Sequence, residues 1–409
     1  MKAPAAAVLE FLKASESSIE VGEVTYAEHV APILQEKCQA CHRPGQVAPF
    51  SLLSYDDAHR RRLGIKDVVL ERRMPPWHAD PRYGHFANDR SLSPLQRAQL
   101  IAWVDQGTPL GELAKMPEPK AFAKGWTIGT PDVVFTMPKP FSVPAEGVLW
   151  YQKFSVPTNF AQDMWIQAIE ARPGDRGVVH HVCVFLKTKI PNEEGVDEKP
   201  ELVCYAPGDI PSVFPPGTAK KIPAGATLVF EVHYTPNGKP RTDQSSVAMI
   251  FARGPVHRMA VTKGISPKGS QRKELVIPPG AGNYEAQTAF TFPFDARLVS
   301  LSPHMHFRGK DFRYTAVYPD GSREVLLSVP LFDFAWQSVY RLAEPKAMPR
   351  GTRIECLAHY DNSADNPNNP EPTAVVRWGE QTWDEMMIGY IDYDIEEPGQ
   401  MARKSTTRR

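Results

Sequence analysis

Hydrophobic positions follow two different periods along the chain, and the change comes near Trp126. Before that residue, apolar side chains recur every three to four positions in three segments, as on one face of a helix. The first segment begins at Thr25, the second covers Asp56–Arg73, and the third lies between Ser93 and Gly107. Thr25 and Ser93 each stand three residues before a Glu or Gln, which predicts a capping box at both starts. We therefore expect a helical N-terminal region.

From Trp126 onward, short apolar runs alternate with Pro- and Gly-rich turns, a spacing typical of β-sandwich and jelly-roll domains. The runs that predict strands are Val133–Met137, Met164–Glu170, Val178–Leu186, Thr227–Tyr234, Val247–Arg253, Arg297–Leu301, Tyr314–Tyr318 and Ile354–Tyr360. A Gly-, Pro- and Lys-rich break near 258–275 separates two halves. Each half contains an apolar strand that ends in a His-Tyr pair, at His233 and at His359. Two related sandwiches are the expected result.

These patterns predict a multidomain chain, with a small all-α domain followed by two all-β jelly-roll or sandwich domains. We place the helical domain at 20–112 and a Pro-, Lys- and Glu-rich linker at 113–125. The two sandwiches are expected at 126–262 and 263–398. A chain of 409 residues is long enough for several domains of ordinary size.

Charge and composition narrow the class of partner. Lys+Arg and Asp+Glu both number 47, so no basic field would attract nucleic acid or an anionic membrane. No apolar run approaches the ~20 residues that a membrane-spanning helix needs. The segment Met1–Leu12 makes a poor signal peptide, because Glu10 interrupts its apolar stretch. We expect neither nucleic-acid binding nor a membrane span.

One short motif carries redox chemistry. The sequence C-Q-A-C-H at 38–42 fits the pattern in which two thiols add across the vinyl groups of a haem and the histidine supplies an axial nitrogen. A zinc site would need a second pair of ligands nearby, and a thioredoxin-like pair would need a βαβ setting. The sequence shows neither. It therefore predicts one covalent haem c at Cys38, Cys41 and His42.

The second axial ligand of that haem is expected at Met74, in a Met-Pro-Pro-Trp loop whose prolines would hold the thioether rigidly. His59, His78 and His85 are the alternatives. Residues 20–112 resemble a bacterial single-haem cytochrome c, which implies electron transfer. Haem attached by the usual bacterial route requires export, so the resemblance also implies a periplasmic or secreted protein.

Five further histidines fall in three motifs of the β-rich region. His180 and His181 are adjacent in an apolar run, and His233 ends another. His304 and His306 form an H-x-H pair, and alternate positions of a strand share a face, so both rings can reach one metal. Adjacent His180 and His181 would point to opposite faces of a regular strand, so a shared ion requires a bulge or a strand end. Alone, His233 would be a hydrogen-bonded core residue, and an isolated H-x-H pair is common by chance.

Together, the order HH, H, HxH, M resembles the type II copper monooxygenases that hydroxylate peptidylglycine and dopamine. The closing segment Thr382–Met386, followed by Tyr390, looks like the Met-ligand segment of that family. The resemblance covers about 126–395 and implies two coppers, a first that stores an electron and a second where dioxygen and a small-molecule substrate meet. The ligands it implies are His180, His181 and His233 for the first copper, and His304, His306 and Met386 for the second.

The sequence departs from that family in several places. Met387 is an alternative ligand next to Met386, which motif register favours. In the peptide-amidating members the position of Met387 is a half-cystine, so its partner here, Cys356, is expected to be a buried thiol. Those members also place an Arg two residues before H-x-H to hold a peptide carboxylate, and Ser302 stands there instead. A C-terminal glycine substrate is therefore not expected, and His359 is an additional candidate copper ligand.

Cys183 and Cys204 are expected to form a disulfide, as pairs do in exported proteins. The leading hypothesis is an exported copper monooxygenase that hydroxylates a C–H bond of a small organic substrate with dioxygen at His304, His306, Met386 and Tyr390. The fused haem would relay electrons from an external reductant or donor protein. The alternatives are a non-catalytic haem and copper protein that transfers electrons or binds copper, and a sandwich pair whose histidines merely pack.

Overall fold

The structure of the chain is a computed structural model, which describes residues 19–187, 200–208, 210–267 and 275–396. The segment Met1–Leu12, part of the break near 258–275 and the end of the domain expected at 263–398 lie outside the described residues. The chain forms two compact units. Unit 1 comprises the residues up to Asp80 together with Asn88–Phe122, and unit 2 comprises Pro81–Ala87 and the residues from Ala123 onward. The division after Phe122 falls inside the segment 113–125 that we expect as a linker.

Unit 1 contains short helices joined by long loops. They are η1 (Tyr26–Val30), α2 (Ala31–Lys37), α3 (Tyr55–Leu70), α4 (Pro94–Asp105) and η2 (Leu113–Lys115). The capping box at the start of α4 is confirmed, since the Ser93 hydroxyl accepts from the Gln96 backbone and the Gln96 side chain accepts from the Ser93 backbone. The box predicted at Thr25 is wrong. The Thr25 side chain makes no cap, and its backbone N–H donates to Nδ1 of His29 at 3.1 Å.

The expected small all-α domain of the cytochrome c kind is not evident, and that part of the predicted fold class is wrong. Helices account for 12% of the chain and strands for 37%. The segments 38–54 and 71–93 contain no helix. Gly45 adopts a left-handed φ of 77°, and Pro75 and Pro76 have no backbone N–H to donate to a helical turn. The segments with a helical pattern therefore do form helices, but turns and loops separate them, and no all-α domain results.

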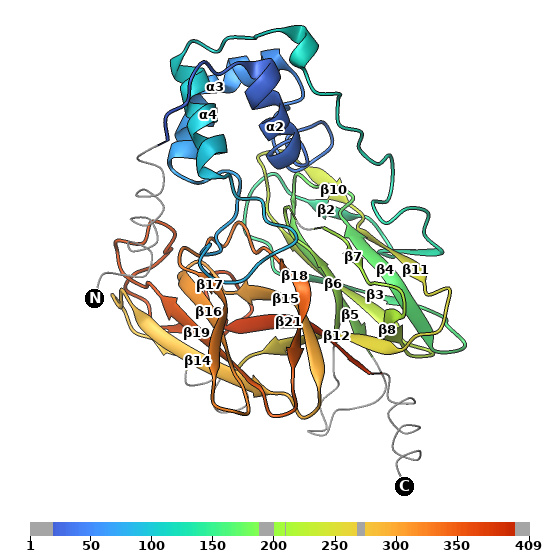
Figure 1. The fold of residues 1–409 in the computed structure, drawn as a ribbon. Helices are drawn as coiled ribbons and strands as arrows, with labels where there is room; N and C mark the ends of the chain where they lie inside the picture. The colour runs from blue at the N-terminus through green and yellow to red at the C-terminus, as the bar shows by residue number, and fades with distance from the viewer. Residues whose placement is uncertain (1–18, 188–199, 209, 268–274, 397–409) are drawn as a thin grey trace. The chain divides into compact units, whose positions relative to one another are not determined.

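The β-rich region is a pair of sandwiches, as expected, and all eight predicted runs form strands (Figure 1). In the first sandwich the sheet β1-β11-β4-β8, with β7 beside β4, faces the sheet β3-β9-β5-β6. Its strands are β1 (Val133–Thr136), β3 (Gln152–Pro157), β4 (Met164–Arg172), β5 (Val179–Lys187), β6 (Glu201–Tyr205), β7 (Ser212–Val213), β8 (Thr218–Ile222), β9 (Thr227–Tyr234) and β11 (Ser246–Phe251). A small ribbon pairs β2 (Phe141–Val143) with β10 (Arg241–Asp243).

The second sandwich contains the sheets β12-β21-β15-β18 and β14-β19-β16-β17. Its strands are β12 (Arg258–Ile265), β14 (Tyr284–Thr291), β15 (Ala296–His304), β16 (Gly309–Val317), β17 (Arg323–Val329), β18 (Tyr340–Met348), β19 (Arg353–Tyr360) and β21 (Ile388–Glu396). A short ribbon pairs β13 (Val276–Ile277) with β20 (Val376–Arg377). Among the residues that the structure describes, no helix is both long and apolar enough to cross a membrane.

The two sandwiches have the same topology. Counted in chain order, each of the four sheets runs first, fourth, second, third. They are also joined, because β8 pairs in parallel with the first two residues of β12 and makes one sheet continuous across both halves. The division that we place between 262 and 263 falls within β12, which pairs along its whole length with β21. The matching strand orders support the interpretation of two related sandwiches.

Candidate functional site

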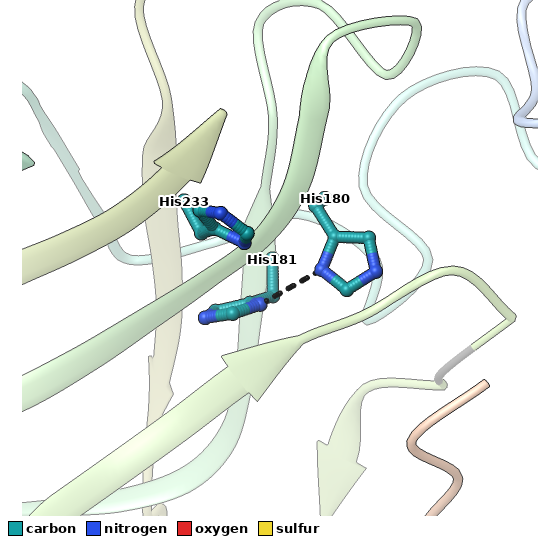
Figure 2. Close-up of side chains that lie close together, drawn as sticks. All are labelled: His180, His181 and His233. Atoms are coloured by element: carbon teal, nitrogen blue, oxygen red, sulfur yellow. Dashed lines mark hydrogen bonds between the residues drawn. The ribbon is translucent and has the colours of Figure 1, made fainter. Parts of the chain in front are cut away.

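Three imidazoles of the first sandwich converge at one point (Figure 2). His180 and His181 lie at the start of β5, and His233 lies near the end of β9, directly opposite His181. The register of β5 shifts between Val179 and His181, which is the irregularity that adjacent histidines need in order to face one ion. One ligand nitrogen from each ring lies within 4.8 Å of the others. The structure thus brings together the residues expected to hold the first copper.

The lowered pKa values of these three imidazoles favour the neutral form that binds a metal ion. Burial lowers the pKa of His180 and of His233 to about 4, and burial together with the neighbouring imidazoles holds the pKa of His181 well below its usual value. All three are therefore neutral at pH 7, as metal ligands must be. The Nδ1 atoms of His180 and His181 are 3.1 Å apart, and Nδ1 of His233 is buried without a hydrogen-bond partner among the described residues. Three neutral imidazoles whose nitrogens converge in this way fit a copper ion.

A second pair of imidazoles lies at the end of β15. The rings of His304 and His306 have their centroids 5.2 Å apart at 88°, although His306 already lies beyond the strand. Nδ1 of His304 contacts the side-chain oxygen of Gln337, and Nδ1 of His306 contacts the backbone oxygen of Asp384 at 3.2 Å. Because those oxygens accept, each Nδ1 carries the proton and each Nε2 keeps its lone pair. Nε2 of His306 is buried and, in the described part of the chain, has no partner of acceptable geometry.

A buried carboxyl group holds the segment of Met386, the candidate thioether ligand, against this pair. Glu385 is fully buried, and its two oxygens accept from the backbone N–H groups of His306 at 2.9 Å and Arg308 at 2.7 Å. Burial raises the pKa of Glu385 to about 8, against the lowering effect of those donors. The next residue, Met386, lines the same cavity as His304, whereas Met387 is fully buried in the core. This placement supports Met386 over Met387 as the ligand.

A cavity of about 210 Å³ lies between the two sandwiches and joins the two groups. The residues that line it are Tyr151, His181, Cys183, Phe185, Glu201, Cys204, Ala206, Glu231, Thr262, Ser300, Ser302, His304, Gln337, Val339, Glu380, Met386, Ile388, Tyr390, Ile391 and Asp392. His181 of the first group and His304 of the second both reach it, together with Tyr390. The Tyr390 ring lies 6.3 Å from that of His304, and burial raises the pKa of its phenol far above the usual value. The phenol therefore keeps its proton at neutral pH and can donate a hydrogen bond.

His359 is tied to other partners. Its Nδ1 lies 2.7 Å from Asp311 and its Nε2 lies 3.5 Å from Glu285. In the matching topology of the two sandwiches, the pair Asp311 and His359 occupies the place of His181 and His233, and each pair follows a register shift. The second sandwich therefore carries a carboxylate–imidazole pair where the first carries two of the candidate metal ligands.

Of the three cysteines outside the C-x-x-C-H motif, two form a disulfide and one is a free thiol, as expected. Cys183 and Cys204 face each other on β5 and β6 and form a disulfide that lines the cavity. Cys356 is a buried thiol on β19. A Cβ atom at Gly389 would come within 2.5 Å of the Cys356 sulfur, so the absence of a side chain at Gly389 makes room for it. Beside this site, the buried Arg308 side chain donates to the side-chain oxygen of Asn362 and to the backbone oxygen of Trp383.

The C-x-x-C-H motif of unit 1 forms a tight turn after α2. The backbone N–H groups of Cys41 and His42 both donate to the Cys38 carbonyl, at 3.1 and 2.9 Å. Nδ1 of His42 lies 3.3 Å from the carbonyl oxygen of Phe50, which leaves Nε2 with its lone pair. Cys38 and Cys41 form no disulfide in the described structure. These features fit a haem that takes both thiols and the histidine.

Met74 lies half-buried in the loop after α3. Of the alternatives to it, His59 has its Nδ1 2.8 Å from the Thr108 hydroxyl, and its ring stacks on Tyr55. His78 lies in the loop beyond Met74, and His85 belongs to unit 2.

The amino-acid sequence gives no sign that Glu385 and Gln337 support the H-x-H pair. Both residues lie far from that pair along the chain, and no pattern of residues connects them with it.

Comparison with known proteins gives no family. No family model matches the chain, and no curated protein matches it. Among solved structures, the major capsid protein P2 of bacteriophage PM2 is 9% identical, with 64% of this chain and 97% of that chain covered and a TM-score of 0.27. A peptide-N(4)-(N-acetyl-beta-D-glucosaminyl) asparagine amidase has the same identity and TM-score, with 65% and 97% covered. Allantoicase from Saccharomyces cerevisiae is 7% identical, with 61% and 80% covered and a TM-score of 0.17. Likenesses this weak support no function.

Proposed function

We propose that this chain is a copper-dependent monooxygenase that hydroxylates a C–H bond of a small organic substrate with dioxygen. The observation that carries the proposal is that two groups of neutral imidazoles reach one cavity, the first through His181 and the second through His304. His180, His181 and His233 would hold one copper, and His304, His306 and Met386 would hold the other. Bound copper would supply the one-electron chemistry and the dioxygen activation that such a hydroxylation needs.

The chain's own residues would orient the ligands and the substrate. Gln337 and the backbone of Asp384 fix the two rings of the H-x-H pair so that each Nε2 stays available. The substrate would lie in the cavity, where Val339, Ile388 and Ile391 supply apolar walls. The protonated Oη of Tyr390 would donate a hydrogen bond to a substrate oxygen or nitrogen there.

Unit 1 would supply the electrons. We propose that a haem is attached covalently at Cys38, Cys41 and His42, with Met74 as the second axial ligand, and that it relays electrons from an external reductant or donor protein. The available Nε2 of His42 supports this assignment. Such attachment, together with the disulfide between Cys183 and Cys204, favours an exported protein.

Isotope labelling tests the activity. Copper-loaded protein would be supplied with ¹⁸O₂, a reductant and a panel of small organic substrates, and products would be analysed by mass spectrometry. A monooxygenase places one labelled oxygen in a product, and His304→Ala abolishes that product. His359→Ala is the matched control, because its imidazole is held by Asp311. Copper binding without labelled product from the panel would instead favour a non-catalytic carrier.

The electron relay has its own test. Haem would be detected in denatured protein by its absorption and would be lost in Cys38→Ser. Protein with reduced haem would then be mixed with its Cu(II)-loaded form under argon. If haem oxidation never accompanies copper reduction, the relay is wrong, whatever the outcome of the labelling experiment.

A further inference from the structure

A buried lysine that has no part in the chemistry proposed above lies beside the cavity wall. Lys220 of β8 is 5% exposed, and its Nζ donates to the backbone oxygens of Leu202 at 2.6 Å and Glu201 at 3.4 Å on β6. Its third hydrogen bond goes to Oγ1 of Thr262, which lines the cavity, at 2.6 Å. Because a buried ammonium is costly unless it is hydrogen-bonded, these three acceptors allow Lys220 to carry a proton at this place.

Thr262 connects this lysine to a carboxylate of the cavity. The Thr262 hydroxyl donates to Oδ1 of Asp392, and the Ser300 hydroxyl donates to Oδ2 at 2.6 Å. These residues are register partners on β12, β21 and β15, so their side chains form one row on the same face of the sheet. All three line the cavity. A continuous chain of hydrogen bonds therefore runs from Lys220 through Thr262 to Asp392 at the cavity surface.

Several charges act on the proton of Lys220. Burial lowers the pKa of Lys220, and the charge of Arg341 lowers it further, whereas the carboxylates of Asp392 and Glu201 raise it. The net direction is downward, so Lys220 gives up a proton more readily than an exposed lysine does. The carboxylate that receives this proton through Thr262 faces the cavity.

The proposed hydroxylation consumes protons. For each C–H bond hydroxylated, dioxygen takes two electrons from the external reductant and two protons, and one of its oxygen atoms enters the product while the other leaves as water. A substrate that occupies this cavity of about 210 Å³ displaces the water that would otherwise bring those protons. We propose that Lys220, Thr262 and Asp392 form a proton relay that supplies one of the two protons inside the occupied cavity. This role rests on the proposed function, to which it adds the proton donor.

The transfers balance along the chain of hydrogen bonds. The ammonium of Lys220 gives a proton to Oγ1 of Thr262, which passes its own proton to Oδ1 of Asp392. The Asp392 carboxyl group then protonates the oxygen atom that leaves as water, and the second proton comes from solvent as the product departs. Water that refills the cavity returns a proton along the same chain to Lys220. Asp392 is the acid that meets the reacting oxygen, and Thr262 and Lys220 act through it.

The hydroxyl of Thr262 is the link that substitution removes most cleanly. Thr262→Val keeps the shape of the side chain without its hydroxyl, and Thr262→Ser retains the hydroxyl. Ser245→Ala is the matched control, because Ser245 donates at 2.8 Å to another buried carboxylate, Asp243, and neither of these two residues lines the cavity. For each copper-loaded full-length protein, kcat and KM would be measured in water and in deuterium oxide with a substrate identified by the isotope labelling.

Thr262→Val is expected to lower kcat by about 100-fold, the smaller end of what acid–base catalysis contributes, and to leave KM within about two-fold of the wild type. Its kcat should also fall further in deuterium oxide than that of the wild type, because proton transfer then limits turnover. Thr262→Ser and Ser245→Ala should keep the wild-type kcat. If Thr262→Val does not fold, Thr262→Ala takes its place.

A second measurement does not depend on activity. Thr262→Val removes an acceptor of the ammonium, so the pKa of Lys220 should fall below that of the wild type, whereas Thr262→Ser should leave it unchanged. Nuclear magnetic resonance of lysine labelled at Cε follows this titration in copper-free protein. A folded Thr262→Val variant with wild-type kcat, or a Thr262→Ser variant as slow as Thr262→Val, would overturn the relay. A wild type that shows the expected Lys220 titration but yields no labelled product would refute the proposed function, and the relay with it.

Discussion

Glu385 is the residue on which the second metal group should depend most, although it is not itself a ligand. Its two carboxyl oxygens accept from two buried backbone N–H groups, those of His306 and Arg308. Glu385→Ala leaves both donors unsatisfied, at about 1–3 kcal/mol each, or about 2–6 kcal/mol of the free energy of unfolding in total. Glu385→Gln keeps one oxygen acceptor but replaces the other with an NH2 group, which cannot accept from a backbone N–H, so we expect a cost of about 1–3 kcal/mol.

Glu385→Gln should lower both the stability of the whole unit and the copper content of the second imidazole group. In a unit of this size, each kcal/mol lowers the melting temperature by about 2–4 °C, so Glu385→Gln should lower it by about 5 °C. Because the same carboxylate fixes the His306 backbone beside the Met386 segment, copper should fall from two ions to one per chain. The assay is a thermal melt followed by elemental analysis of the folded, dialysed protein.

A second buried carboxylate provides the control. Asp243 in the first sandwich is fully buried and accepts from the hydroxyls of Tyr234 and Ser245 at 2.9 and 2.8 Å. Asp243→Asn should lower the melting temperature similarly but leave copper in the group of His304 and His306. If Glu385→Gln melts earlier and still binds two coppers, Glu385 is a stabilising residue only, and the reasoning about the second group is refuted.

Three further outcomes follow from single features. Met386→Leu should weaken Cu(I) binding while Met387→Leu leaves it unchanged, since only Met386 reaches the cavity; competition with a Cu(I) chelator measures this. Replacing Cys183 and Cys204 by Ser should cost about 3 kcal/mol, because the disulfide closes a loop of 21 residues; a chemical denaturation midpoint equal to that of the wild type would contradict it. Ser93→Ala should cost about 1 kcal/mol at the start of α4, seen as faster amide exchange in its first turn.

The sequence predicted those features whose cause is local. Strands followed from short apolar runs between turns, and the capping box at Ser93 followed from three residues of sequence. The bulge at His180 also followed, because two adjacent side chains can share a face only where the strand is irregular. Each of these depends on residues close together in the chain.

Features that depend on distant residues were not predictable. The all-α expectation failed because helix signals at Asp56–Arg73 and after Ser93 say nothing about the loops between them. The continuous sheet depends on β8 meeting β12, a parallel contact with no signature in either strand. Glu385 is 79 residues from His306, whose backbone it holds, and only the fold brings the two together.

The most direct test of the two-site proposal is copper stoichiometry. Elemental analysis of the purified, copper-loaded chain should give two ions in the wild type, one in His181→Ala and one in His306→Ala, with His359→Ala retaining two. A copper-free wild type, or His181→Ala and His306→Ala variants that still bind two ions, would contradict the assignment of the two groups.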